Sequence, residues 1–122
     1  MGRVTIFDNQ DSTNAFDLAD ILMLIEPSID RSWRVAGVVS FGLASEQLQR
    51  FSDNATRMTD RALHQVAMGI DQTLAGEFAA FQQDVEHPSI VIRARRDAVF
   101  EVETDEQALL AAIKAKFVRV ES

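Results

Sequence analysis

The longest hydrophobic pattern in the chain runs from Ser45 to about Glu86, a stretch without proline. Its apolar residues recur at steps of three and four, which is the spacing of one helix face. These positions are Leu48, Phe51, Ala55, Met58, Ala62, Val66, Ile70, Leu74, Phe78, Phe81 and Val85. The pattern therefore predicts helix throughout residues 45–86.

The same pattern drifts, and the drift decides how many helices it predicts. Between Phe51 and Val85 the mean step is about 3.8 residues, longer than the 3.6 residues per turn of a straight helix. A straight helix would turn such a stripe steadily away from one core. Either the segment breaks near Gly69 or Gly76 into two helices, or one long helix buries different faces at its two ends. We favour the break, because a helix of about forty residues is rare in a chain of this size.

Shorter apolar patterns precede this segment. Residues 4–7 predict a short strand, and residues 15–26, apolar on nearly every side, predict a helix. Pro27 ends that helix, because the residue before a proline is disfavoured in the helical conformation. Residues 33–41 predict a strand with its odd-numbered side chains on one face. The other face carries further apolar residues such as Val38, so we expect a central strand.

The C-terminal part of the sequence has the clearest local signals. Residues 90–95 and 98–103 predict a hairpin around Arg96 and Asp97, with the even-numbered side chains buried. The opposite face carries two arginines and two glutamates whose cross-strand attraction supports this register. They are Arg93, Arg95, Glu101 and Glu103.

A capping box predicts the start of the last helix. The Thr104 hydroxyl can accept from the N–H of Gln107, whose side chain can reach back, so we expect a helix at 105–115. Residues 117–120 predict a final strand. The element order is then β-α-β-α(α)-β-β-α-β, in a single domain over residues 1–122. We predict an α+β fold with a small mixed or mostly antiparallel sheet and helices mainly on one face.

Charge and composition narrow the possible partners. The 122 residues carry a formal net charge of −7 and include no cysteine. An acidic chain without a basic face disfavours nucleic-acid and membrane-surface binding. The longest apolar run, residues 21–25, is far shorter than a membrane span, and no secretory signal pattern opens the sequence. We therefore expect a soluble cytoplasmic protein.

The candidate chemistry is sparse. Asp60 and His64 are spaced i, i+4, so they would share a helix face and could form an acid–base pair. A surface hydrogen bond is the commoner outcome of such a spacing, and catalysis requires His64 to line a concave pocket. There is no glycine-rich phosphate loop and no zinc-ligand pattern, so we predict neither a cofactor nor a metal.

Two further features suggest binding surfaces. Trp33 could be an exposed hot spot beside arginines, although a core position is favoured, and Arg93 and Arg95 could hold an anion if the glutamates did not neutralise them. The apolar excess in residues 15–25 and 51–81 exceeds what one small core readily covers. The candidate binding or interface residues are Trp33, Met58, Val66, Ile70, Leu74, Phe78, Arg93 and Arg95.

Two functional hypotheses follow from these features. The first is a non-enzymatic binding or interaction module, homodimeric through apolar helix surfaces, which could also hold a small apolar ligand or a basic protein partner. The second is a small enzyme whose acid–base chemistry centres on Asp60 and His64. The sequence does not identify the ligand, substrate or partner in either case.

Overall fold

The computed structural model describes residues 2–10, 16–54 and 57–122. Its strands are β1 (Gly2–Ile6), β2 (Arg31–Phe41), β3 (Met58–Thr59), β4 (Gln72–Gln82), β5 (Ile90–Arg95), β6 (Val99–Thr104) and β7 (Val120–Glu121). Its helices are the 3-10 helix η1 (Asp8–Gln10) and the α-helices α1 (Leu18–Leu22), α2 (Ser45–Asn54), α3 (Asp60–Met68) and α4 (Gln107–Lys116). None of these helices is long and apolar enough to span a membrane.

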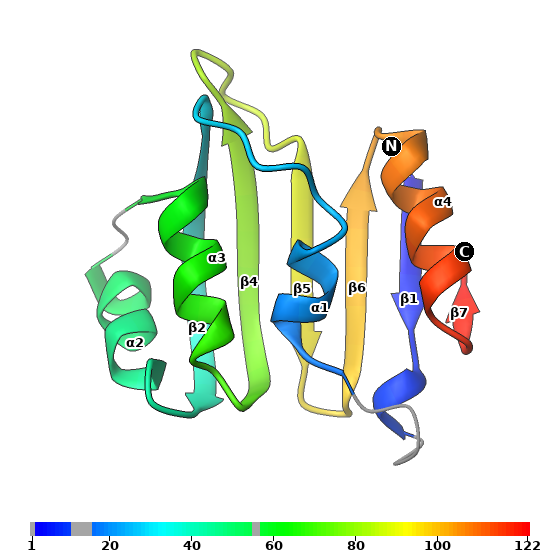
Figure 1. Cartoon of the computed structure of the whole chain (residues 1–122), viewed down its shortest axis with the longest axis horizontal. Coiled ribbons are helices and arrows are strands. Elements are labelled where there is room, and N and C mark those ends of the chain that lie inside the picture. The colour runs from blue at the N-terminus through cyan, green and yellow to red at the C-terminus, as the bar shows by residue number, and fades with distance from the viewer. Residues whose placement is uncertain (1, 11–15, 55–56) are drawn as a thin grey trace.

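All these strands belong to one sheet in the order β3-β2-β4-β5-β6-β1-β7, and each neighbouring pair is antiparallel. Figure 1 shows α1, α3 and α4 in front of one face of this sheet, with α2 beside β2. The largest fully buried side chains, Trp33, Phe78 and Phe100 among them, lie on the helix-covered face in the main core. The predicted α+β class is therefore confirmed, and the sheet is antiparallel.

Residues 45–86 differ most from prediction. The described part of this segment does contain two helices, but the predicted place of the break between them is wrong, because β3 at residues 58–59 separates α2 from α3 and Gly69 is the C-cap at the end of α3. The helix predicted beyond it is wrong, because residues 72–82 form β4, between β2 and β5. Residues 78–81 are all buried, alternately on the two faces of the sheet. Such a run lacks the alternation that identifies a half-buried strand, and its alanines favour helix as well.

A bulge changes the predicted faces of β2. The β2–β4 register shifts beyond Ala36, where Gly37 has a φ of +61°. Across the pair, Gly76 has a φ of +152°, and a Cβ there would lie 3.0 Å from Val38 Cγ2. The bulge turns Val38 into the core and leaves Phe41, predicted on the buried face, 56% exposed.

β2 has strand partners on both sides, as expected, but β3 covers it only at Ser32 and Trp33. Beyond these two residues, helix α2 lies along the same edge of β2. The Val38 backbone N–H, freed by the bulge, donates to the Ser52 hydroxyl of α2 at 3.2 Å. The helix therefore covers part of an edge that would otherwise be open to pairing with another chain.

The helix predicted at 15–26 is shorter in the structure. α1 covers residues 18–22, and residue 15 lies outside the described part of the chain. Beyond Leu22 the chain tightens, because the backbone N–H groups of Leu24 and Ile25 donate three residues back to Ile21 and Leu22. These short-range bonds end the α-helix before Pro27 is reached.

The predicted capping box is not formed. α4 begins at Gln107, with Glu106 rather than Thr104 as its N-cap residue. The Thr104 hydroxyl instead accepts from the Glu106 N–H at 3.1 Å and donates to the Ser89 carbonyl at 2.9 Å. It therefore ties the end of β6 to the start of β5. The last strand is also shorter than predicted, because β7 covers only residues 120–121.

The predicted hairpin is confirmed, except that β6 begins at Val99 and Ala98, predicted on the buried face, lies exposed in the turn with a φ of +66°. β5 and β6 pair antiparallel, with Ile92 opposite Val102 on the buried face and Arg93 opposite Glu101 on the other face. The side-chain bonds run diagonally, from Arg93 to Glu103 and from Arg95 to Glu101. The face of the sheet away from the helices thus carries a charged cluster at this hairpin, beside the small buried cluster of Ala79, Phe81 and Val91.

Candidate functional site

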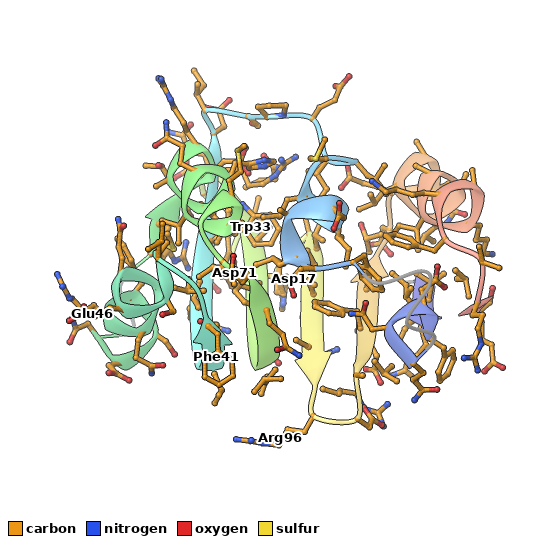
Figure 2. The ribbon with its side chains drawn as sticks, turned by 60° about the horizontal axis from the view of Figure 1, so that its bottom comes forward. Asp17, Trp33, Phe41, Glu46, Asp71 and Arg96 are labelled. Carbon is orange, nitrogen blue, oxygen red and sulfur yellow. The ribbon has the colours of Figure 1, made fainter. Side chains whose placement is uncertain are left out.

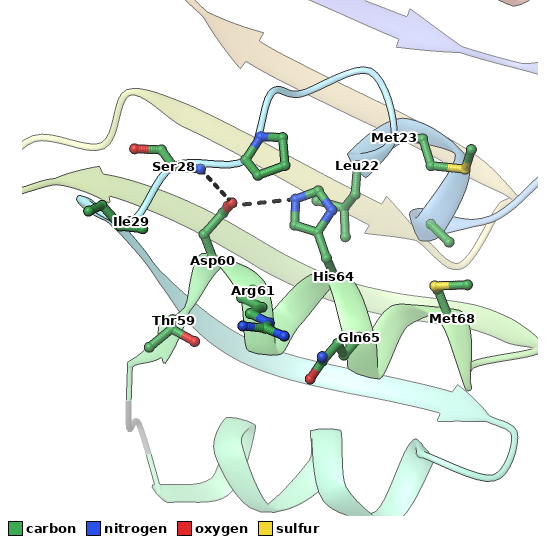
Figure 3. Close-up of a pocket in the computed structure, with 12 residues that line it drawn as sticks. Leu22, Met23, Ser28, Ile29, Thr59, Asp60, Arg61, His64, Gln65 and Met68 are labelled. Atoms are coloured by element: carbon green, nitrogen blue, oxygen red, sulfur yellow. Dashed lines mark hydrogen bonds and ion pairs between the residues drawn. The ribbon is translucent and has the colours of Figure 1, made fainter.

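A cavity of about 640 Å³ lies between α1 and α3, beside the loop that joins α1 to β2. Figure 3 shows this space and the side chains around it. Half of its lining is apolar, namely Ala19, Leu22, Met23, Pro27, Ile29 and Met68. The other half is polar, namely Ser28, Thr59, Asp60, Arg61, His64 and Gln65.

The local sequence explains why the cavity has these walls. One wall is a single stripe of α3 at spacings i, i+1, i+4, i+5 and i+8, formed by Asp60, Arg61, His64, Gln65 and Met68. Thr59 fixes the start of that helix, because its hydroxyl accepts from the Ala62 N–H at 3.1 Å. The opposite wall is the short helix α1. Its N-cap residue Asp17 accepts from the N–H and the hydroxyl of Thr73 in β4, both at 2.8 Å.

Asp60 is the buried polar centre of the site. Its side chain is 1% exposed, and Oδ1 accepts from Trp33 Nε1 at 2.7 Å and lies 3.5 Å from Arg31 Nη1. Its other oxygen, Oδ2, accepts from the Ser28 N–H at 3.1 Å. A buried carboxylate is tolerated when it is paired and hydrogen-bonded in this way. Asp60 therefore joins α3, β2 and the loop after α1.

His64 lies between Asp60 and the cavity. Its Nε2 is 3.6 Å from Asp60 Oδ1, is buried, and has no hydrogen-bond partner among the described residues. Figure 3 shows the second ring nitrogen on the side away from Asp60. His64 lines the cavity, so the geometric requirement of the enzyme hypothesis is met. A carboxylate beside one ring nitrogen orients an imidazole and leaves the other nitrogen for a ligand or water.

The rim of the cavity exposes large apolar side chains. Met23 is 75% exposed and Met68 is 83% exposed. Ile29, on the loop that joins α1 to β2, is fully exposed. Flexible, polarizable methionine side chains suit a surface that must adapt to a bound molecule. Exposed apolar residues gathered around a cavity are typical of a binding site rather than of an ordinary surface.

Most of the predicted interface residues lie inside the molecule. Trp33, Met58, Val66, Ile70 and Phe78 belong to the main core, and none is more than 6% exposed. Trp33 therefore takes the core position rather than the exposed one. These five side chains are not available to a second subunit or a ligand on the surface of the folded chain.

Leu74 and Arg95 line a different cavity of about 630 Å³ near the β5–β6 turn. Figure 2 shows Phe41 and Arg96, two of its lining residues, at the lower end of the sheet, with Trp33 higher up between the helices. The wall also includes residues 9 and 16, which flank 11–15 outside the described part of the chain. The cavity between α1 and α3 is therefore the better defined site.

Arg93 and Arg95 form a charged ladder on the open face of the sheet. Arg93 bonds Glu77 and Glu103, and Arg95 bonds Glu101 and Asp97. The hydrogen bond with Glu103 raises the pKa of Arg93 above its ordinary value, and the hydrogen bond with Glu101 does the same for Arg95. Both arginines are thus paired with carboxylates of the chain itself.

Neither a metal site nor a known relative identifies the function. No group of three or more potential metal-ligating side chains occurs within residues 2–10, 16–54 and 57–122. In comparisons with protein-family models, with curated proteins and with solved structures, the chain has no match. Function must therefore be inferred from the geometry of the cavity.

Reasoning from the sequence found Asp60 and His64 but missed the rest of this site. The stripe of α3 that contains Arg61 and Met68 was a usable signal, because it follows from helix geometry once Asp60 and His64 are chosen. For the opposite wall, from residues 19–29, the apolar excess of residues 15–25 indicated a binding surface but not that it faces α3. Its approach to α3 depends on long-range packing.

Proposed function

We propose that this protein binds a small organic molecule with an apolar body in the cavity between α1 and α3. The observation that supports this most is the cavity itself, about 640 Å³ in volume, half lined by apolar side chains and bordered by exposed methionines. A volume of this size suits a ligand of modest size. The few polar groups at Asp60 and His64 would fix the ligand's orientation.

A neutral apolar probe tests this proposal. N-phenyl-1-naphthylamine becomes strongly fluorescent when it leaves water, so titration should give saturable binding to the wild type. Met68→Glu should weaken binding about tenfold, because it replaces apolar contact area at the rim with a charge. Leu43→Glu is the matched control, since Leu43 is also a largely exposed apolar residue and lies outside the cavity lining.

Two results would contradict the proposal. One is no saturable probe binding by the wild type, and the other is equal binding by the wild type and both variants. Light scattering on the same samples tests whether the rim of the cavity forms a subunit interface instead. A wild-type dimer that Met68→Glu dissociates and Leu43→Glu does not would assign the rim to a subunit interface instead.

The position of His64 favours a second candidate function, acid–base catalysis on the bound molecule. Here His64 would accept a proton from a ligand or a water held in the cavity, and Asp60 would orient the ring. Hydrolysis of p-nitrophenyl octanoate provides a simple assay, in which water attacks the ester carbonyl and p-nitrophenol leaves. Multiple turnovers that His64→Gln abolishes would support catalysis. Equal rates for the wild type and this variant would leave binding as the function.

A further inference from the structure

The cavity has an unbalanced charge. Three ionisable side chains line it, those of Asp60, Arg61 and His64. The negative charge of Asp60 is already matched by Arg31 and by two further hydrogen bonds. Arg61 is exposed and has neither an ion-pair nor a hydrogen-bond partner among the described residues. A free cation therefore borders the cavity, although the chain as a whole carries a formal net charge of −7.

The arrangement of charge and apolar surface is that of an amphiphile-binding site. Arg61 and His64 are three residues apart on α3, so their side chains are neighbours on one face of the helix. Met68 continues the same stripe, and Leu22 and Met23 face it from the C-terminal end of α1. A ligand lying along the stripe would meet a cation at one end and apolar side chains along the rest.

We infer that the ligand of this site is a single-chain amphiphile with a carboxylate head. The inference deepens the proposed function and depends on it. The head binds at Arg61, whose planar guanidinium matches a carboxylate, and the second ring nitrogen of His64 adds a hydrogen bond. The alkyl chain lies between Leu22 and Met23 on one side and Met68 on the other.

Displacement of N-phenyl-1-naphthylamine by four straight-chain amphiphiles tests the inference. They differ chiefly in the head, on an alkyl chain of seven carbons in octanoate and eight in octyl phosphate, 1-octanol and octyltrimethylammonium. Octanoate should bind about fivefold more tightly than 1-octanol, which is the size of effect that an exposed ion pair provides. The trimethylammonium compound should bind more weakly than the alcohol, because its charge opposes that of Arg61.

Two variants locate the effect. Arg61→Gln should remove the preference for octanoate and leave 1-octanol binding within about twofold, since that variant keeps most of the apolar wall. Arg50→Gln is the matched control. It removes the same charge from an exposed arginine on α2, outside the lining of this cavity. It should change neither affinity.

Each other outcome overturns the inference. Equal binding of octanoate and 1-octanol would reject the anionic head, and tighter binding of octyl phosphate would replace the carboxylate with a phosphate. An equal loss of both affinities in Arg61→Gln would assign Arg61 a packing role only. In these cases the probe still binds, so the proposed function stands. If the probe itself does not bind to the wild type, the proposed function fails as well.

Discussion

Two clusters of charged side chains in this molecule have the same chemistry in opposite surroundings. Arg31 and Asp60 meet at the wall of the α1–α3 cavity, where their side chains are 6% and 1% exposed. On the open face of the sheet, Arg93 bonds Glu77 and Glu103 while all three side chains keep access to water. The first cluster has lost its hydration and the second has kept it.

The difference shows where this fold depends on charge. Desolvation makes a buried pair expensive to form and damaging to break, whereas an exposed pair contributes little because water replaces a lost partner. The open-face ladder is thus a solvated surface that supports the hairpin register. The Asp60 cluster holds three parts of the chain together and leaves His64 Nε2 without a hydrogen bond. A buried ring nitrogen without a hydrogen bond lowers stability, and such local costs are expected at functional sites.

Removing one carboxylate from each cluster should show the difference between the two clusters most clearly. Asp60→Ala leaves Arg31 buried without its counter-ion and the Trp33 N–H without an acceptor, so the free energy of unfolding should fall by about 3–5 kcal/mol. Glu103→Ala, the matched carboxylate on the open face, should lower it by less than about 1 kcal/mol. Urea denaturation followed by circular dichroism measures both. Similar losses for the two variants would contradict the account.

The two histidines allow a finer test. His64→Leu removes a buried ring nitrogen that has no hydrogen-bond partner among the described residues. We therefore expect the free energy of unfolding to stay unchanged or rise by up to about 1 kcal/mol. His87→Leu, at an exposed position in the β4–β5 connection, should change it by less than about 0.5 kcal/mol. A loss of 2 kcal/mol or more, on the order of a broken buried network, would show that His64 serves the fold rather than the site.

The smallest expected effect belongs to the ladder. Arg93→Gln should lower the free energy of unfolding by less than about 1 kcal/mol, and the loss should shrink as salt screens the ladder. The pKa of Arg93 is raised in the folded chain, so its contribution is complete below the ordinary arginine pKa and is lost only above the folded value. The variant's deficit should therefore be the same at pH 6 and pH 9. A deficit that persists in 1 M salt would mean that the ladder is not a solvated one.

How far the sequence predicts this fold depends on how local the decisive contacts are. The β5–β6 hairpin is predicted within one residue of its bounds, because its turn, its alternation and its opposite charges lie within about fifteen residues. β4 is missed, because neighbouring strands on both sides remove the alternation from residues 78–81. The capping box at Thr104 fails for a similar reason, since the hydroxyl is held by the Ser89 carbonyl 15 residues away and accepts from the Glu106 N–H instead of that of Gln107.

The candidate site divides in the same way. Asp60 and His64 are predictable as a pair because helix geometry alone places side chains four residues apart together. The bond between Asp60 and Trp33 spans 27 residues, and Met23 reaches the cavity only because α1 packs beside α3. No local pattern predicts either contact. The sequence could therefore identify Asp60 and His64 but not the cavity that they line.

The methionine methyl signals test the central claim most directly. Met23 and Met68 line the cavity, whereas Met58 is 1% exposed in the core and is not part of the lining. In a protein labelled with ¹³C at the methionine methyls, titration with 1-octanol should shift the Met23 and Met68 signals along one saturable curve and leave Met58 in place. The α1–α3 cavity is then a ligand site. If Met23 and Met68 stay in place while the alcohol binds, or if Met58 moves as far as they do, the ligand lies elsewhere and the account is contradicted.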